Sequence, residues 1–206
     1  MNICTLLKCS CAGILTLGLL LWPLEQPADS QKVSVEKQQT CNRRQILTAS
    51  SCAGDILNRE ERKLYQSLNA YRRENGLPAI PLSPSLSLVA NRHVLDLELN
   101  IGSLTHSWSN CRYDVSNRST YPCMWNAPQR LGTAYLGSGY ENAYSISSGE
   151  ATAAAALRTW QSSRPHNAVM LNQDIWSDNN WRAVGVGIHG GYAVMWFGEE
   201  SDPATF

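Results

Sequence analysis

The chain has 206 residues, with 17 basic and 17 acidic side chains and a formal net charge of zero. This length suits one domain, or one domain with a tail, and the balanced charge argues against a nucleic-acid-binding protein, which normally carries a basic stripe. An apolar fraction of 43% that includes seven tryptophans excludes wholesale disorder.

The N-terminus has the pattern of an export signal. Lys8 is the only charged side chain before an apolar run from Cys11 to Leu24. This run is shorter than the roughly 20 residues of a membrane span and typical of a signal-peptide core. We therefore expect residues 1–28 to be a signal peptide, cleaved near Ala28, or an uncleaved anchor that provides the sole membrane attachment. The protein is then secreted and extracellular, or periplasmic.

The seven cysteines divide into two groups. Three lie in the first eleven residues, and the other four are Cys41, Cys52, Cys111 and Cys123. In an oxidising compartment these four can form two disulfides, for which three pairings exist. We expect the local pairing, Cys41 with Cys52 and Cys111 with Cys123, which closes two short loops. The first loop falls in a segment, residues 29–57, that we interpret as a polar linker.

Four helices are predicted between residues 58 and 172. Leu57, Leu64, Leu68 and Tyr71 indicate a helix over 58–74, and apolar residues at helical spacing indicate another over 85–100. Ser147 and Glu150 have the spacing of a capping box before an alanine-rich helix that ends near Trp160. Pro165 starts a fourth helix that runs to about Asn172.

The C-terminal part predicts a β-hairpin. Residues 183–189 and 192–197 alternate around Gly190-Gly191, a pair suited to a two-residue turn. The second strand is apolar on both faces and needs cover on both, while Gly185 and Gly187 allow a helix to approach closely. We therefore expect an α+β fold, a three-layer α/β/α sandwich with a central antiparallel sheet.

Few side chains are candidates for chemistry. His93 lies on the apolar face of a predicted helix, so a satisfied core or cavity-wall histidine is favoured there. His106 and His166 lie at junctions between elements, where binding groups gather. The N-terminal end of a helix favours the neutral form of His166, which is the form of a metal ligand or general base. Glu141 is a lone carboxylate without a basic neighbour, which suggests a partner distant in sequence.

The order of these pieces identifies a family resemblance. Residues from 58 to about 199 resemble the CAP superfamily (cysteine-rich secretory proteins, antigen five and pathogenesis-related proteins), especially its bacterial SCP-type members. The matching segments, in family order, are LNAYRRENGLPAIPL, the L-x-x-x-A-x-x-H pattern ending at His93, LTHS, GYENAY, WQSSRPHNAVML and VGVGIHGGYAVMWFG. We therefore expect residues 58–206 to form a CAP domain.

The resemblance implies a central cavity, which in the family usually presents two histidines and two glutamates. Carried over, these are His106, Glu141 and His166, while Ser163 occupies the position of the second glutamate. With Asn142 and His93 beside them, they form the expected cleft. Two histidines and one glutamate can hold Zn²⁺ or another divalent metal with an open position. No residue is assigned a catalytic role.

Two long inserts, one holding Cys111 and Cys123 and one over 172–180 with Trp176, are expected to shape the rim of this cleft. The leading hypothesis is a secreted, non-enzymatic binding module for an extracellular ligand, which is a small apolar molecule, a lipid or sterol, or a protein. The alternative is a metal-dependent hydrolase or peptidase that uses His106, Glu141 and His166. A third interpretation makes the cleft structural only.

Overall fold

The computed structural model describes residues 40–205. The predicted signal peptide or anchor and the first part of the predicted linker lie outside this range. The elements in chain order are helices α1 (Arg59–Glu74), α2 (Pro84–Asp96), α3 (Pro122–Trp125) and α4 (Ala127–Arg130), strand β1 (Tyr140–Ser145), helices α5 (Ala153–Ser162) and α6 (Arg164–Leu171), and strands β2 (Ala183–His189) and β3 (Tyr192–Gly198). Among the described residues, no helix is long and apolar enough to cross a membrane.

The sheet is antiparallel, with strand order β1-β3-β2. The hairpin of β2 and β3 turns at Gly190-Gly191, as predicted. Strand β1 was not predicted from the sequence. It pairs with β3 along its whole length, from Tyr140 opposite Phe197 to Ser145 opposite Tyr192. The central strand is therefore β3, which explains why it is apolar on both faces.

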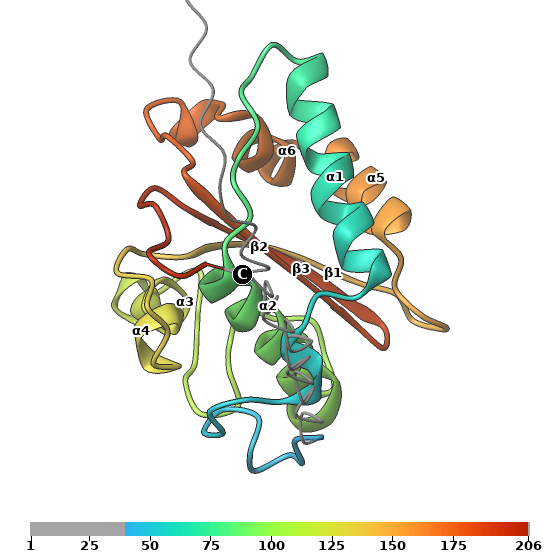
Figure 1. Ribbon diagram of the computed structural model, residues 1–206, viewed down its shortest axis with the longest axis vertical. Helices are drawn as coiled ribbons and strands as arrows, with labels where there is room; N and C mark the ends of the chain where they lie inside the picture. The colour runs from blue at the N-terminus through green and yellow to red at the C-terminus, as the bar shows by residue number, and fades with distance from the viewer. Residues whose placement is uncertain (1–39, 206) are drawn as a thin grey trace, which may run out of the picture. The chain divides into compact units, whose positions relative to one another are not determined.

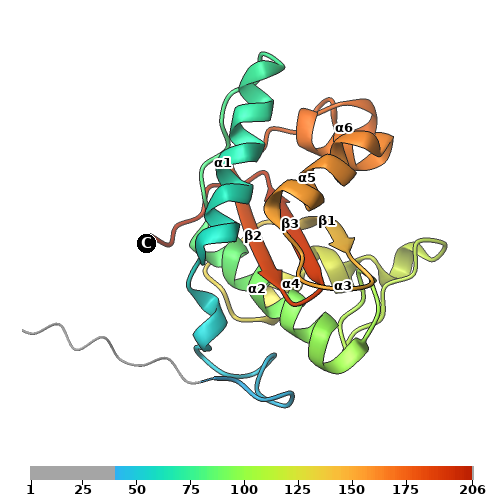
Figure 2. The same ribbon diagram turned by 90° about the vertical axis from the view of Figure 1, so that its right-hand side faces the viewer.

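Helices cover both faces of the sheet, which confirms the predicted three layers (Figures 1 and 2). On one face, α1, α5 and α6 enclose a core with Val184, Val186 and Met195 of the sheet. On the other, α2 and the short helices α3 and α4 pack against Val194 and Trp196. The α+β sandwich thus has two separate apolar cores, one on each side of β3.

Helix α2 lies unusually close to β2. A Cβ atom added to Gly185 would come within 2.0 Å of the carbonyl carbon of Leu86, and one added to Gly187 within 2.5 Å of that of Ala90. These glycines therefore let the helix backbone contact the strand directly, as the sequence predicted. The close approach fixes the height of α2, which carries Arg92 and His93, above the sheet.

The predicted capping box at Ser147 and Glu150 is wrong. Helix α5 begins at Ala153, and its N-cap is Thr152, whose hydroxyl accepts a hydrogen bond from the backbone N–H of Ala155 at 3.2 Å. Gly149 lies between the two candidate caps with a φ of +87°, a left-handed conformation that interrupts a helix. The chain therefore stays irregular until Thr152.

Residues 41–57 belong to the folded domain, which corrects their interpretation as a linker. The Cys41–Cys52 disulfide closes a loop whose Ile46 is fully buried. The buried Arg92 of α2 holds this loop, because its guanidinium donates to the carbonyl of Ala49 at 3.1 Å and to Asp55 at 2.6 and 2.8 Å. The segment is therefore folded against α2, although its sequence is polar.

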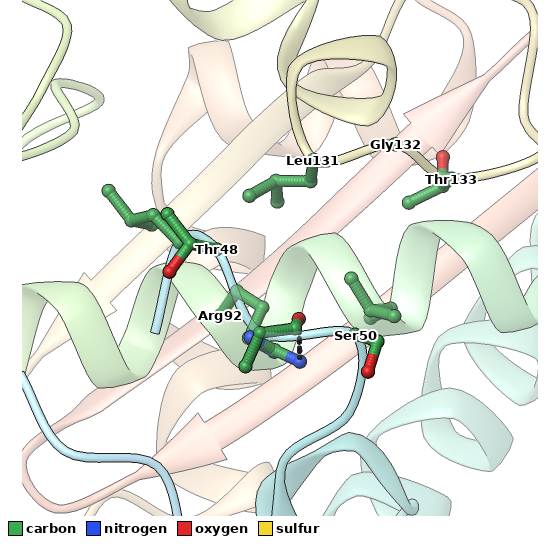
Figure 3. A pocket seen from close by; sticks show the side chains of 9 residues that line it. Thr48, Ser50, Arg92, Leu131, Gly132 and Thr133 are labelled. Carbon is green, nitrogen blue, oxygen red and sulfur yellow. Dashed lines mark hydrogen bonds between the residues drawn. The ribbon is translucent and has the colours of Figure 1, made fainter. Parts of the chain in front are cut away.

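Beside this loop is a pocket of about 230 Å³, which Figure 3 shows from close by. It is lined by Thr48 and Ser50 of the loop, by Arg92, and by the turn at Leu131, Gly132 and Thr133. The four hydrogen bonds of Arg92 to Asp55 and to the loop carbonyls already occupy its guanidinium. This pocket is therefore part of the clamp that holds the N-terminal loop on α2.

Candidate functional site

The site is built around Glu141, the second residue of β1, whose side chain is fully buried. Its Oε1 is 2.5 Å from Nδ1 of His93, and its Oε2 is 2.6 Å from Nδ1 of His106. His93 comes from α2, and His106 from the loop that follows α2 and its π-helical turn at Leu97–Ile101. One carboxylate therefore joins two histidines, and these are the distant partners that its isolation in the sequence suggested.

The surroundings of the buried pair of His93 and Glu141 favour the charged form of each partner. Burial opposes the imidazolium of His93, but the adjacent Glu141 carboxylate outweighs burial and raises the pKa of His93. Burial also opposes the carboxylate of Glu141, but His93 and His106 outweigh it and hold the pKa of Glu141 below its usual range. The other ring nitrogen of His93 bonds the carbonyl of Ser107 at 3.0 Å, and the ring stacks on Trp108 with centroids 4.4 Å apart.

His166 lies in the first turn of α6 and is anchored through its ring and its backbone. Its Nδ1 shares a hydrogen bond of 2.7 Å with Oγ of Ser163, and its carbonyl accepts one of 2.9 Å from Nδ2 of Asn142. Burial lowers the pKa of His166, and the charge of nearby His106 adds to this effect. The ring is therefore held neutral, as expected, but mainly because of burial and not because of the helix dipole.

These side chains meet at a cavity of about 400 Å³. His106, Glu141, Asn142 and His166 line its polar end. Of the other predicted site residues, His93 lies behind Glu141 at the cavity floor and Ser163 reaches the cavity through His166. The family resemblance implied a cleft of these residues, whereas the helical pattern favoured a role for His93 in the core. The ring of His93 stacks on Trp108 and bonds Glu141, so it contacts both the core and the site.

The two inserts supply most of the rest of the cavity wall, together with Pro165 and Val169 of α6. From the first come Tyr113, Val115, Tyr121, Met124 and Trp125, and from the second Ile175 and Trp176. The Cys111–Cys123 disulfide closes the first insert, and with Cys41–Cys52 it confirms the predicted pairing. Both inserts therefore shape the rim as expected.

Comparison with known families agrees with this geometry. The model of the cysteine-rich secretory protein family, CAP, matches residues 65–194, more than half of the chain. The chain belongs to the CAP family. No curated protein matches the CAP chain by sequence.

Solved structures are similar to this chain at low sequence identity. An extracellular protein from Bacillus anthracis with an SCP domain is 19% identical with a TM-score of 0.53, over 68% of this chain and 40% of that one. A cysteine-rich secretory protein from Staphylococcus aureus is 16% identical with a TM-score of 0.48, over 68% and 38%. An outer surface protein of Borrelia burgdorferi is also 16% identical with a TM-score of 0.48, over 71% and 97%. This CAP chain therefore spans about two fifths of the first two proteins.

The predicted metal set of His106, His166 and Glu141 fits this CAP cavity only in part. Both oxygens of Glu141 bond histidines, and within residues 40–205 no group of three or more His, Cys, Asp or Glu side chains is arranged to hold a metal ion. The polar end offers the Nε2 atoms of His106 and His166, with Glu141 behind His106. Zinc centres normally use at least three protein ligands, so these residues do not form a complete set.

The aromatic wall of this CAP site was predicted from the sequence only in outline. Tyr113 stacks on Tyr121 at 5.2 Å, Tyr121 meets Trp125 edge-on, and Tyr140 of β1 connects that ring to Trp176. The clustering of aromatic residues in the two inserts was the signal that could have revealed it. Their contact depends on distant chain segments, and no local pattern encodes it.

Proposed function

We propose that this CAP-domain protein is an extracellular binding module that holds a small, largely apolar ligand in the cleft between His106, Glu141 and His166. One observation carries the proposal: a cavity of ligand size has four polar side chains at one end, and the rest of its lining is aromatic and aliphatic side chains from two inserts and from α6. Small-molecule sites are typically concave and mainly apolar, with a few placed polar groups. Both oxygens of Glu141 already bond histidines, so the site residues do not form a complete set of metal ligands, which supports binding over turnover.

An extracellular location suits this role. Two disulfides within the described residues fit an oxidising compartment. The similar Bacillus anthracis protein is described as extracellular. The signal-peptide pattern of the first 28 residues supports export, with an uncleaved anchor as the alternative.

Native mass spectrometry of the exported full chain tests the proposal. We expect the wild-type protein to retain a small molecule, and the His106→Ala and His166→Ala variants to lose it while melting at similar temperatures. His189→Ala is the matched control, because His189 is exposed at the hairpin and does not line this cavity. A protein that carries no ligand from any expression medium, or variants that retain it as well as wild type, would contradict a binding cleft.

The alternative function is a metal-dependent hydrolase. It is favoured by the bond of 2.6 Å between Glu141 and Nδ1 of His106, because a carboxylate often orients a metal-binding imidazole in this way. His106 and His166 would hold the metal, which would activate water there. This function predicts hydrolysis of peptide or glycan substrates that a chelator abolishes and added Zn²⁺ restores. Turnover that persists in His106→Ala and His166→Ala would point to a contaminant.

A further inference from the structure

The polar end of the cavity contains a buried hydrogen-bond acceptor without a partner among the described residues, Oδ1 of Asn142. Nδ2 of Asn142 is committed to the carbonyl of His166 at 2.9 Å, which fixes the orientation of the amide. Its Oδ1 accepts no hydrogen bond from any described residue, although Asn142 is only 1% exposed and lines the cavity. A buried acceptor without a partner destabilises the protein by itself, so a donor brought to this floor would be bound favourably.

Two neighbouring residues, His106 and Glu141, also affect which head group a ligand can place here. His106 donates Nδ1–H to Glu141, so in its neutral form its Nε2 is a second acceptor. Both oxygens of Glu141 are already bonded, and its negative charge lies at the floor. An anionic head group would therefore meet lone pairs and a buried carboxylate, and it would be disfavoured.

The opposite end of the cavity is apolar and open to solvent. Val115, from the first insert, is 74% exposed, and Ile175, from the second, is 84% exposed, yet both line the cavity. Four aromatic rings, those of Tyr113, Tyr121, Trp125 and Trp176, line the same cavity. An apolar body that occupies this space would cover both exposed aliphatic side chains.

Resting on the proposed function, we infer that the ligand is amphipathic, with a hydrogen-bond-donating head, a hydroxyl or a protonated amine, at Asn142 and His106. Its apolar body lies between the aromatic walls and extends toward Val115 and Ile175. Hydroxyl and ammonium heads share the donor chemistry that the floor requires. The aromatic faces also attract an ammonium group, so the two heads have to be separated by experiment.

Four probes with the same apolar body separate the head groups: phenylbutanol, phenylbutylamine, phenylbutanoate and the methyl ether of phenylbutanol. Binding to the full chain is measured by calorimetry and by tryptophan fluorescence, since Trp125 and Trp176 line the cavity. We expect the alcohol, the amine or both to bind about fivefold to tenfold more tightly than the ether, and the carboxylate to bind most weakly.

Substitutions in the cavity test where the head group and the apolar body of the ligand bind. Asn142→Leu removes the free acceptor, and we expect it to abolish the preference for the alcohol or amine over the ether. Val115→Ser with Ile175→Ser should weaken all bound probes alike. Leu136→Ser is the matched control, because Leu136 is 82% exposed and does not line the cavity.

The outcomes separate this inference from the proposed function. Equal affinity for all four probes, or tighter binding of the carboxylate, overturns the donor head and leaves the cleft as a binding site. Binding of none of the probes overturns the amphipathic ligand, and together with an empty cavity in native mass spectrometry it overturns the proposed function too. If Asn142→Leu does not fold, the wild-type order of the four affinities still decides the head group.

Discussion

The strongest prediction concerns the buried ion pair behind the cavity. His93→Leu places an apolar side chain of similar size against Trp108, but it removes the imidazole whose Nδ1 lies 2.5 Å from Oε1 of Glu141. Both side chains of the pair are 0% exposed, so no water replaces the lost partner. Breaking a buried pair by removing one partner costs about 3–5 kcal/mol, and we expect this decrease in the free energy of unfolding.

Urea denaturation at neutral pH measures the decrease, and His189→Leu is the control. His189 is exposed, so its replacement should change stability by less than about 0.5 kcal/mol. A double-mutant cycle with Glu141→Gln then isolates the interaction between the two side chains. The double variant should lose less free energy of unfolding than the two single variants lose in sum. A loss below about 1 kcal/mol in His93→Leu, or strict additivity, would refute a charged and coupled pair.

The contribution of the His93–Glu141 pair to stability also depends on pH. The folded-state pKa of His93 is raised, so its contribution is present at low pH and disappears as the pH rises through that value. The folded-state pKa of Glu141 is lowered, so its contribution disappears as the pH falls through that value. The stability difference between wild type and His93→Leu should therefore be largest between the two folded-state pKa values and shrink on both sides. A difference that does not vary with pH would contradict the assignment.

Three further predictions use the same denaturation assay. Gly185→Ala places a Cβ 2.0 Å from the Leu86 backbone and should destabilise by about 3 kcal/mol; a neutral effect would mean that α2 can move away from β2. Replacing Cys111 and Cys123 by serine opens the first insert, which should cost about 3 kcal/mol and weaken ligand binding, while unchanged affinity would exclude the insert from the site. Asn58→Ala removes the N-cap of α1 and should cost about 1 kcal/mol, visible in thermal melts followed by circular dichroism, unless water caps the helix equally well.

The parts of the fold that the sequence predicted are those with local periodicity or strong turn residues. Helix α1 and the β2–β3 hairpin follow from such patterns. Strand β1 does not, because Glu141 and Asn142 are polar residues that a strand interior usually avoids. Its pairing with β3 brings together segments about 50 residues apart, so only tertiary structure reveals it.

The candidate site also has features that were expected from the sequence and features that only the tertiary structure reveals. The resemblance to a family placed His106, Glu141 and His166 together, but not how they are bonded. That His93 contacts Glu141 depends on the height of α2 above the sheet, which the glycines of β2 set. A histidine on an apolar helix face is indistinguishable by sequence from one that neutralises a buried carboxylate 48 residues away.

The resemblance implies a glutamate where this chain has Ser163, and the serine affects the charge of the cavity. A carboxylate at this position would face Nδ1 of His166 and favour its charged form, whereas the Ser163 hydroxyl bonds the ring without adding charge. Burial can then keep His166 neutral, and the described cavity floor retains one ionised carboxylate, Glu141, balanced by His93. This floor disfavours an anionic head group. Among the other head groups, hydrogen-bond direction is the selective property, and the free acceptor of Asn142 determines that direction.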